Sequence, residues 1–503
     1  MSNYEWQNIN DESFEEMLKN SISEPPSSVI SEVTPWKKSI NRALAGIALE
    51  TITLNFYYLN YILPAIGTIM KLLGFRTLKH ENKWFKACYT ISVILAVFHF
   101  SSLILNTTIF QSTFYNSSAN TVIIFIRCIL SIIEFFCLWR GFLTVQRKAD
   151  LPAHVGGAVA LIVFYVIIYL LALMEFEGLI IPIALIIVYI FIIRSLCKLS
   201  KELYEAGYVI RTKPIKITNR CIVISIVSIL IVGFACGYVF GNGYPMKWTP
   251  KDSAEHANVE KIKSDLVALG FPEDVLNDIS TEDISACNGA LQVIVQENDQ
   301  KVSYGMTAIM DSLFGVSSEN GSEISNLHFT AIAVKIPAEQ NRWMMFHHFC
   351  WENNPAFYGT EAIQIWPAYE ENYYYPAGDA TGRVLYDKDG ETFMSDYDFL
   401  GTKTYTSESV FFGSQTSNDI FATFSMPKNS EHQRGYVAYP IDEVQFGRVV
   451  QSWCNYVHQN TLFVYPSVTA MEYRMKDSMF NTSNTFTTFQ DQLTIHPEEI
   501  IAE

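Results

Sequence analysis

Long apolar segments fill the chain from Thr51 to Phe240, and none follows between Trp248 and Glu503. A helix needs about 20 apolar residues to cross the hydrocarbon layer of a bilayer. The chain is therefore expected to have a membrane half followed by a water-facing half. The composition agrees, because a mean hydropathy of +0.14 with 17% charged residues is too apolar for an ordinary soluble enzyme and too charged for a wholly embedded transporter.

Five segments match a membrane-spanning helix in length and hydropathy. They are Phe85–Phe110, Thr121–Leu143, Val155–Phe176, Leu179–Leu199 and Cys221–Gly241. Basic residues gather after the second segment and before the last one, whereas residues 106–120 and 175–178 hold no Lys or Arg. Since basic loops stay in the cytoplasm, the chain should leave the last segment on the extracytoplasmic side. The C-terminal domain is then extracytoplasmic.

A sixth apolar segment, Ala43–Phe75, is ambiguous because basic residues flank it on both sides. Both flanks cannot be cytoplasmic if the segment crosses once. It contains Glu50 and Pro64, so a kinked, re-entrant or interfacial helix competes with a true crossing. A crossing gives six spans and an external amino terminus, and the alternative gives five spans and an internal one. Residues 1–42 are polar and acidic and are expected to form a disordered tail.

Charge is divided unevenly between the two halves. Residues 1–250 carry a net charge of +6, and residues 251–503 carry −22, with 14 Lys and Arg against 36 Asp and Glu. A domain this acidic repels nucleic acid and anionic lipid headgroups. DNA and RNA are therefore not expected as partners, whereas cations, cationic peptides and neutral ligands are compatible.

Polar side chains inside the apolar segments are few, and they are the usual place to look for transport chemistry. Arg127 and Glu134 lie seven residues apart on one face of the second segment. His99 falls in the outer half of the preceding segment, at a depth that could match Arg127. These residues either line a path for protons or ions, or hold helices together by hydrogen bonds. The last three segments have no charged residue in their central stretches, which weakens the case for transport.

The membrane bundle, residues 43–243, is expected to lead into a short helical region at 244–290 and then a β-rich domain at 291–503. In the helical region, one apolar helix face ends at Gly270 and Pro272. The β-rich domain has aromatic and β-branched runs between turn residues. Candidate strands are Leu327–Ile336, Arg342–Trp351, Thr360–Trp366, Gly382–Asp387, Glu391–Met394, Asp419–Met426, Arg434–Tyr439 and Thr461–Met475. This pattern predicts a sandwich or jelly roll, and Val444–Val457 fits either a helix or a strand.

The most distinctive loop, residues 366–383, combines aromatic rings with acids. Its candidate ligand-binding residues are Trp366, Tyr369, Glu370, Glu371, Tyr373, Tyr374, Tyr375 and Asp379. Aromatic faces can stack on sugars or hold a cation, and loops on rigid β scaffolds often carry binding residues. The same tyrosines could instead cap one end of a sandwich, so the sequence supports both interpretations equally.

Two other patterns in this domain favour structural roles. His347 and His348 are neighbours in an expected strand, so they point to opposite faces and cannot both bind one metal. The sequence Asp387–Glu391 resembles a calcium loop but lacks the late acidic ligand, and its Asp389 and Gly390 favour a hairpin turn. No metal site or cofactor is expected.

The three cysteines outside the apolar segments, Cys287, Cys350 and Cys454, are an odd number. One disulfide with a free thiol and three buried thiols are both compatible with that number. No nucleophile elbow, zinc-protease motif or paired-cysteine motif stands out, so the sequence does not indicate an enzyme.

The main hypothesis is a multi-pass cell-membrane protein whose extracytoplasmic β-rich domain binds or senses a ligand. Its expected partners are the lipid bilayer and a cell-surface or cell-wall ligand. A solute or ion transporter or channel with an outer accessory domain is the first alternative. A membrane-anchored extracytoplasmic hydrolase with an unrecognised carboxylate pair is the second.

Overall fold

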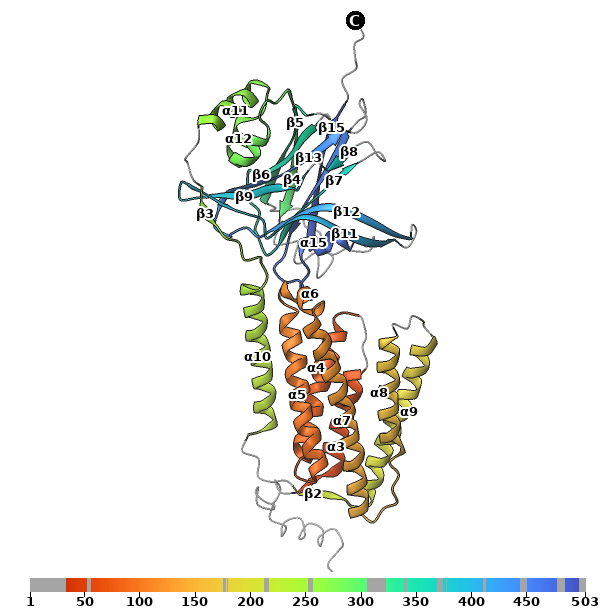
Figure 1. Cartoon of the computed structure of the whole chain (residues 1–503). Helices are drawn as coiled ribbons and strands as arrows, with labels where there is room; N and C mark the ends of the chain where they lie inside the picture. Colours follow the sequence, from red (N-terminus) through yellow and green to blue (C-terminus); the bar gives the residue numbers. More distant parts are fainter. Residues whose placement is uncertain are drawn as a thin grey trace, which may run out of the picture. The chain divides into compact units, whose positions relative to one another are not determined.

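The structure is a computed structural model, and its chain contacts divide it into two compact units (Figure 1). One unit holds residues 1–105 and 112–234, and the other holds residues 106–111 and 235–503. The described residues are 33–51, 56–174, 178, 180–211, 217–251, 257–304, 323–338, 342–368, 374–376, 378–409, 413–443, 450–476 and 485–496.

The first unit is a bundle of helices. Among the described residues, six helices are long and apolar enough to cross a membrane: α4 (Leu59–Leu78), α5 (Lys83–Leu105), α7 (Ser118–Lys148), α8 (Gly156–Leu173), α9 (Ile180–Glu205) and α10 (Asn219–Phe240). Each of the five predicted segments corresponds to one of the helices α5 and α7 to α10. Their long apolar runs account for these helices.

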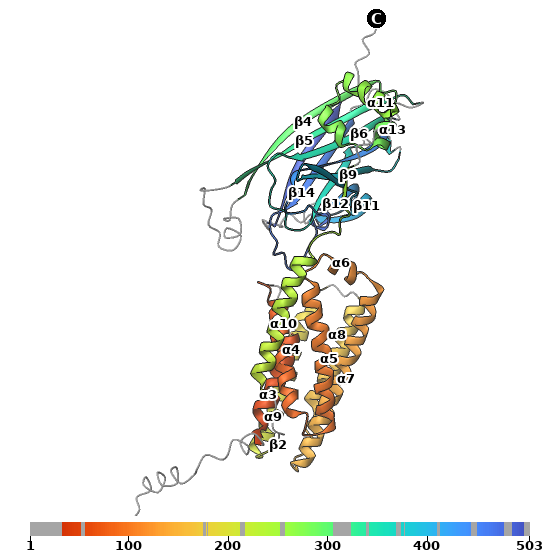
Figure 2. The same cartoon turned by 90° about the vertical axis from the view of Figure 1, so that its left-hand side faces the viewer.

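The ambiguous N-terminal segment forms two helices. α3 (Trp36–Thr51) and α4 lie side by side in both views of the bundle (Figures 1 and 2). Their contacts run in opposite directions: Gly46 lies beside Lys71, Gly67 beside Glu50, and Gly74 beside Ala43. The pair is therefore an antiparallel hairpin. Hydropathy does not show such a reversal inside an apolar run. Because the basic flanks meet at one end of the hairpin, its charges no longer conflict with the rule for basic loops.

Helix α3 begins within the residues expected to form the disordered tail. The short strand β1 (Val33–Pro35) pairs with β2 (Val209–Arg211), and Trp36 follows directly. The Trp36 side chain is fully buried, with its ring centroid 6.0 Å from Phe85, 6.1 Å from Phe142 and 5.6 Å from Tyr208. Residues 36–42 therefore belong to the bundle, because burial of this indole holds the start of α3 in place.

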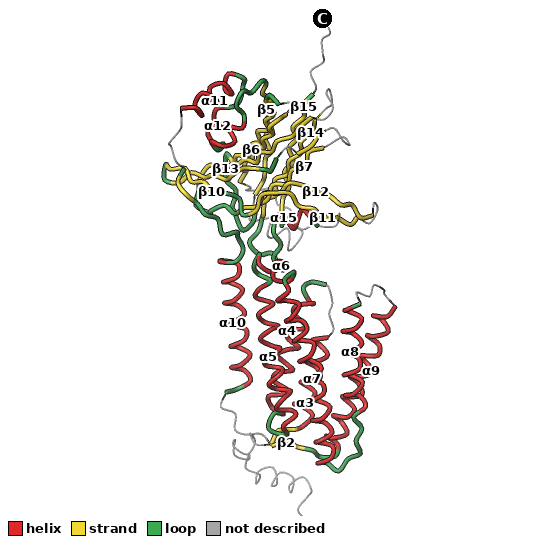
Figure 3. The backbone as a smooth tube through the Cα atoms, viewed as in Figure 1, coloured by secondary structure: helices red, strands yellow, loops and turns green. Residues whose placement is uncertain are grey.

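The second unit contains two antiparallel sheets (Figure 3). The larger has the order β3 (Thr249–Pro250), β10 (Glu391–Ser395), β9 (Thr381–Lys388), β13 (Glu431–Glu443), β6 (Arg342–Trp351), β5 (Glu323–Ile336) and β4 (Gln292–Tyr304), and β8 (Tyr374–Pro376) also pairs with β13. The smaller has the order β11 (Phe399–Ser409), β12 (Gly413–Phe424), β7 (Glu361–Ala368), β14 (Val450–Gln459) and β15 (Phe486–Ile495).

The two sheets share one apolar core. Phe329, Phe349 and Val437 of the larger sheet join Ile363 and Tyr456 of the smaller one in a single buried cluster. The other face of the larger sheet is covered by the short helices α11 (Ala257–Ala268), α12 (Glu273–Asp278) and α13 (Thr281–Ala286). Strands β5, β6 and β13 are thus apolar on both faces, which explains their continuous apolar runs.

Adjacent residues in β6 follow the expected alternation. His347 Nε2 lies 2.6 Å from Ser452 Oγ in β14, on the face toward the smaller sheet. His348 Nε2 lies 3.0 Å from Asp278 Oδ2 in α12, on the opposite face. The two imidazoles therefore lie on opposite faces of the larger sheet, as the alternation of side chains along a strand predicts.

The hairpin turn between β9 and β10 is confirmed. Lys388 pairs with Glu391, and the two residues between them have positive φ, 54° at Asp389 and 82° at Gly390. A two-residue turn of this kind matches the twist of the strands and favours glycine at its second position. The stretch that resembles a calcium loop, Asp387–Glu391, therefore forms this hairpin turn.

The prediction of a strand over Thr461–Met475 is wrong. This stretch is a loop followed by the helix α15 (Ala470–Met475). The Thr469 side chain accepts a hydrogen bond from the Glu472 amide, and the Glu472 side chain accepts one from the Thr469 amide. This reciprocal cap starts a helix despite the β-branched residues before it. The ambiguous region resolves as strand β14 from Val450, and its residues 444–449 lie outside the described part of the chain.

The loop before α15 packs against residues 106–111, which follow α5. Ser467 donates its amide to the Asn106 carbonyl at 2.7 Å, and the Gln111 side chain donates to the Ser467 carbonyl. The Asn242 amide group, just after α10, donates to the Tyr358 carbonyl at 2.9 Å. The chain segments that continue from α5 and α10 are therefore built into the β-rich unit.

Candidate functional site

Three charged side chains meet inside the helical bundle. Lys71 of α4 lies between Glu50 of α3 and Glu134 of α7, with its Nζ 2.5 Å from Glu50 Oε2 and 3.2 Å from Glu134 Oε2. Lys71 is 2% exposed and Glu134 is 1% exposed, whereas the Glu50 side chain is 28% exposed. The cluster is therefore reached from the surface of the bundle at Glu50 and closed at Glu134.

Hydroxyl groups complete this cluster. The Ser92 hydroxyl of α5 donates to Glu134 Oε1, and the Thr68 hydroxyl of α4 donates to Glu50 Oε1 at 3.3 Å. Each of the four carboxylate oxygens thus has a donor. Ser92 and Thr68 are buried. Such satisfied networks rigidify a buried polar site, because an unpaired polar group in a low dielectric is costly.

The structure brings only one of the three predicted intramembrane residues into this cluster. Glu134 belongs to it, but Arg127 lies about 10 Å away along α7, since a helix rises about 1.5 Å per residue. His99 is partly buried, and its Nε2 has no hydrogen-bond partner within the part of the chain that the structure describes. Glu50 and Lys71 are not among the predicted residues, because Glu50 is interpreted there only as a feature of an interrupted segment and Lys71 counts as one of the basic residues at the carboxyl end of that segment. The sequence feature that could have identified Lys71 as a candidate is the apolar sequence on both sides of it.

A second candidate site lies on the outer face of the five-stranded sheet. Trp366 of β7 pairs directly with Trp453 of β14, and their rings are stacked, with centroids 6.2 Å apart and planes 6° apart. Their neighbours Ile365 and Cys454 point into the core, so both rings lie on the opposite face. Each ring is half-buried. The pair presents an aromatic surface that remains accessible.

A network of polar side chains adjoins the tryptophan pair on the same face. Gln364 donates to Asp419 Oδ2 at 2.6 Å and to the Tyr405 hydroxyl at 2.9 Å. The Arg474 side chain of α15 donates to Gln364 Oε1 at 2.8 Å, and the Asn455 side chain donates to the same oxygen at 3.3 Å. Asn455 is 3% exposed, and its Oδ1 finds no hydrogen-bond partner among the described residues. The network therefore holds fixed donors and acceptors beside the aromatic surface.

A hollow of about 530 Å³ opens on the other side of Trp453. It is lined by residues 296–298 of β4, by Trp453, and by residues 490–492 and 494 of β15. The Asn298 amide group donates to Asp491 Oδ1 at 3.3 Å. Burial raises the pKa of Asp491. Apart from the one ring, the lining is polar and suits a ligand with several hydroxyl groups.

The other loop residues proposed from the sequence lie apart from Trp366 or outside the described residues. Tyr369, Glu370, Glu371 and Tyr373 lie outside them. Tyr374 and Tyr375 lie in β8, whose backbone pairs with β13 of the larger sheet. Asp379 is exposed, two residues before β9. Trp453 was not among the candidates, because its pairing with Trp366 depends on a strand register that the local sequence does not show.

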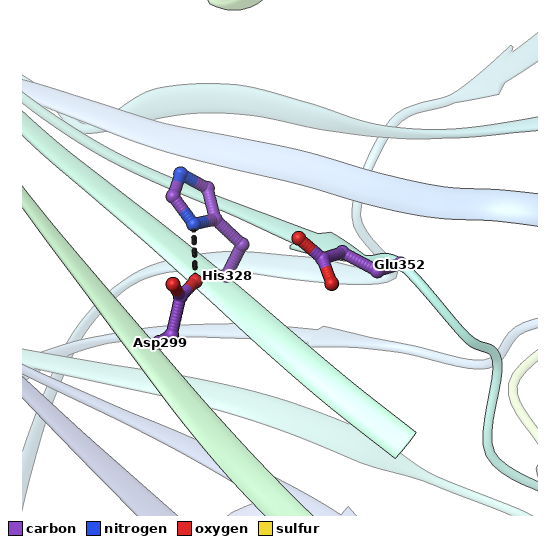
Figure 4. A group of neighbouring side chains, drawn as sticks. All are labelled: Asp299, His328 and Glu352. Atoms are coloured by element: carbon purple, nitrogen blue, oxygen red, sulfur yellow. Dashed lines mark hydrogen bonds and ion pairs between the residues drawn. The ribbon is translucent and has the colours of Figure 1, made fainter. Parts of the chain in front are cut away.

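Asp299, His328 and Glu352 form a group on the larger sheet (Figure 4). His328 Nδ1 lies 2.6 Å from Asp299 Oδ1, and one ligand atom from each residue falls within 4.8 Å of the others. Carboxylate and imidazole groups at such distances can hold a divalent ion. Since exposed acidic groups commonly lie this close without an ion, we assign no metal to this group.

No family model matches the chain, and no curated protein matches it. Among solved structures, the chain is similar to the crystal structure of the KRT10-binding region domain of the pneumococcal serine rich repeat protein PsrP, with 7% identity and a TM-score of 0.19 over 41% of this chain and 99% of that one. It is also similar to a pore forming protein, with 7% identity and a TM-score of 0.18 over 40% of this chain and 90% of that one. Similarities this weak carry no argument about function.

Proposed function

We propose that this chain is a multi-pass membrane protein that binds a neutral, hydroxyl-rich ligand, such as a cell-surface or cell-wall sugar, on its β-rich unit. The observation that carries the proposal is the stacked pair of Trp366 and Trp453 beside fixed polar groups. Aromatic faces pack against the apolar faces of sugar rings, while neighbouring amides and carboxylates bond the hydroxyl groups. The net charge of −22 on residues 251–503 disfavours anionic ligands.

The β-rich unit is proposed to lie on the extracytoplasmic side. The basic loops of the bundle support this orientation. Residues 106–120 hold no Lys or Arg and are therefore assigned to the extracytoplasmic side, and the end of α10 is assigned to the same side. Ile109 donates its amide to the Gly241 carbonyl at 2.8 Å, which agrees with one shared side for these two chain segments. A ligand outside the cell would then reach the tryptophan pair directly.

Binding is proposed to be sensed by the bundle through the loop before α15. Arg474 of α15 bonds Gln364 beside the tryptophan pair, and Ser467 in the preceding loop bonds Asn106, the residue after α5. A shift of α15 on ligand binding would therefore displace this loop and the residue that follows α5. This arrangement supports a receptor role over that of a passive anchor.

The test is binding of a panel of neutral oligosaccharides to the full-length chain in lipid nanodiscs. Trp366→Ala should weaken binding roughly tenfold or more, because a stacked aromatic contact contributes about 1 kcal/mol beyond its buried area. Phe393→Ala is the matched control, since Phe393 stacks on Tyr386 in the larger sheet at a centroid distance of 5.2 Å. A folded chain that binds no sugar in the panel, or binding equally weakened by both variants, contradicts the proposal.

A further inference from the structure

The charged cluster of the bundle has an unequal number of charges. Glu50 and Glu134 supply two carboxyl groups, and Lys71 supplies one ammonium group between them. If all three are ionised, the cluster carries one uncompensated negative charge. A charge without a partner is very unfavourable in the interior of a membrane-spanning bundle, and ionisable groups found there mark sites of ion or proton chemistry.

The other groups around the cluster do not supply the missing positive charge. From α5, Cys88 donates its thiol to the Glu134 carbonyl at 3.5 Å, and His99 lies near enough to Glu50 and Lys71 to be affected by their charges. From α7, Cys137 lies near Glu134, and Arg127 lies two helical turns from it. Among the described residues, Lys71 is the one cation in an ion pair with either carboxylate.

Helices α8 and α9 contribute hydroxyl groups beside Glu50. The hydroxyl of Tyr189 donates to Thr51 Oγ1 at 2.8 Å, and that of Tyr165 contacts the same atom. Thr51 follows Glu50 at the end of α3, so these phenols lie next to the partly exposed side of the cluster. They can orient a proton or a water molecule there, but they carry no positive charge.

We propose that the Glu50–Lys71–Glu134 cluster is a proton-binding site, at which one proton from water is shared between the two carboxyl groups. When a proton binds one carboxylate oxygen, that carboxylate becomes a neutral carboxyl group. Lys71 remains an ammonium ion paired with the other carboxylate, so the cluster becomes neutral. Glu50 is the group that meets the proton first, because its side chain is 28% exposed whereas Glu134 is 1% exposed.

The hydroxyl groups of Ser92 and Thr68 suit both states of this site. A hydroxyl donates to a carboxylate and accepts from a carboxyl group, so rotation of its hydrogen preserves the contact when the proton arrives. Lys71 can only donate, and it stays paired in either state. The site can therefore gain and lose a proton without leaving a buried polar atom unpaired. This function is separate from ligand binding on the β-rich unit.

The test is infrared difference spectroscopy of the full-length chain in lipid, recorded between alkaline and acidic pH. Besides any band from buried carboxyl groups outside the cluster, such as Asp491, the wild-type chain should show one further stretching band of a protonated carboxyl group in apolar surroundings. Glu50→Gln should abolish this band, because one carboxylate then remains for one ammonium group and no proton is needed. Glu134→Gln should abolish it for the same reason. Lys71→Met should retain it, since two carboxyl groups then lie close together without a cation.

Glu81→Gln is the matched control, because Glu81 pairs with Lys148 at 2.6 Å outside the cluster. It should leave the band unchanged. If Glu134→Gln does not fold, the partly exposed Glu50 position decides the result alone. The proposal is overturned if the wild-type chain shows no such band, or if the band persists in Glu50→Gln.

Discussion

The backbone of Gly46 in α3 lies directly against the backbone of Lys71 in α4. A Cβ atom on Gly46 would overlap the Lys71 amide nitrogen and would stand 2.6 Å from the Gly67 carbonyl oxygen. Small residues let two helices approach in this way, which is a common means of helix packing in membranes. The same contact places the Lys71 side chain beside Glu50.

Gly46→Ala should therefore destabilise the bundle. The added methyl group meets backbone atoms that cannot rotate away, and overpacking of this kind costs about 1–3 kcal/mol or more. Gly156→Ala is the control, since a Cβ there meets nothing within 4 Å and alanine favours a helix. Thermal unfolding of the full-length chain in detergent should show a lower Tm for Gly46→Ala alone. Equal Tm values for the two variants would contradict the close packing of α3 on α4.

Lys71→Met should lower the free energy of unfolding by about 3–5 kcal/mol, because it leaves the buried Glu134 and the partly exposed Glu50 without their cation. The triple variant with Glu50→Gln and Glu134→Gln should recover much of this loss, since no charge then remains. Lys148→Met should cost about 1 kcal/mol or less, because the Lys148 side chain is 48% exposed. Thermal unfolding of the four proteins measures these differences. A triple variant less stable than Lys71→Met would refute the role assigned to charge balance.

His347 should make the β-rich unit sensitive to acid. Burial lowers the pKa of His347 to about 3, below its ordinary value of 6.5. As the pH falls below 6.5, the unfolded chain binds a proton that the folded chain does not. Stability is therefore complete above about pH 6.5 and is lost progressively towards pH 3, by a few kcal/mol in all.

Denaturant unfolding of the wild-type chain and His347→Gln at several pH values tests this expectation. The variant should lose less stability between pH 6.5 and 4 than the wild-type chain. His432→Gln serves as the control, because the His432 side chain is 61% exposed whereas His347 is buried. Parallel pH curves for the wild-type chain and His347→Gln would show that another group causes the acid sensitivity.

The proposed orientation predicts opposite labelling of two introduced cysteines. Asp389→Cys lies at the exposed tip of the β9–β10 turn, and Arg147→Cys lies in the exposed last turn of α7. A membrane-impermeant maleimide applied to intact cells should label Asp389→Cys and leave Arg147→Cys unlabelled. The exposed native Cys197, Cys221 and Cys236 are replaced by Ser beforehand. Labelling of Arg147→Cys alone would show that the orientation is the reverse of the one proposed.

Hydropathy predicted the five later helices because each is a continuous apolar run. It could not predict the α3–α4 hairpin, since the reversal lies within one such run. The aromatic and β-branched runs likewise predicted a β-rich domain. The strands β4, β11 and β15 were not predicted, because their sequences are largely polar. These strands lie at sheet edges, where fewer apolar residues are required.

The candidate sites depended more strongly on distant contacts. Glu134 and Trp366 were found because each is unusual in its own segment. Their partners Lys71 and Trp453 look ordinary locally, one as a basic flank and the other as an apolar residue in an ambiguous stretch. Only the packing of α4 on α7 and the register of β7 with β14 bring them together.

The hairpin also bears on how this chain is made. α3 has 16 residues and carries Glu50 in its last turn, and α4 carries Lys71 within its apolar sequence. Each helix carries a charged side chain that makes its entry into lipid alone less favourable, because a lone charge disfavours partition into hydrocarbon. As a pair, Glu50 and Lys71 cancel their charges without Glu134, which follows Lys71 by 63 residues in the chain. We therefore expect this region to insert only after both helices have been synthesised. Glu134 then packs against the pair once α7 has been made.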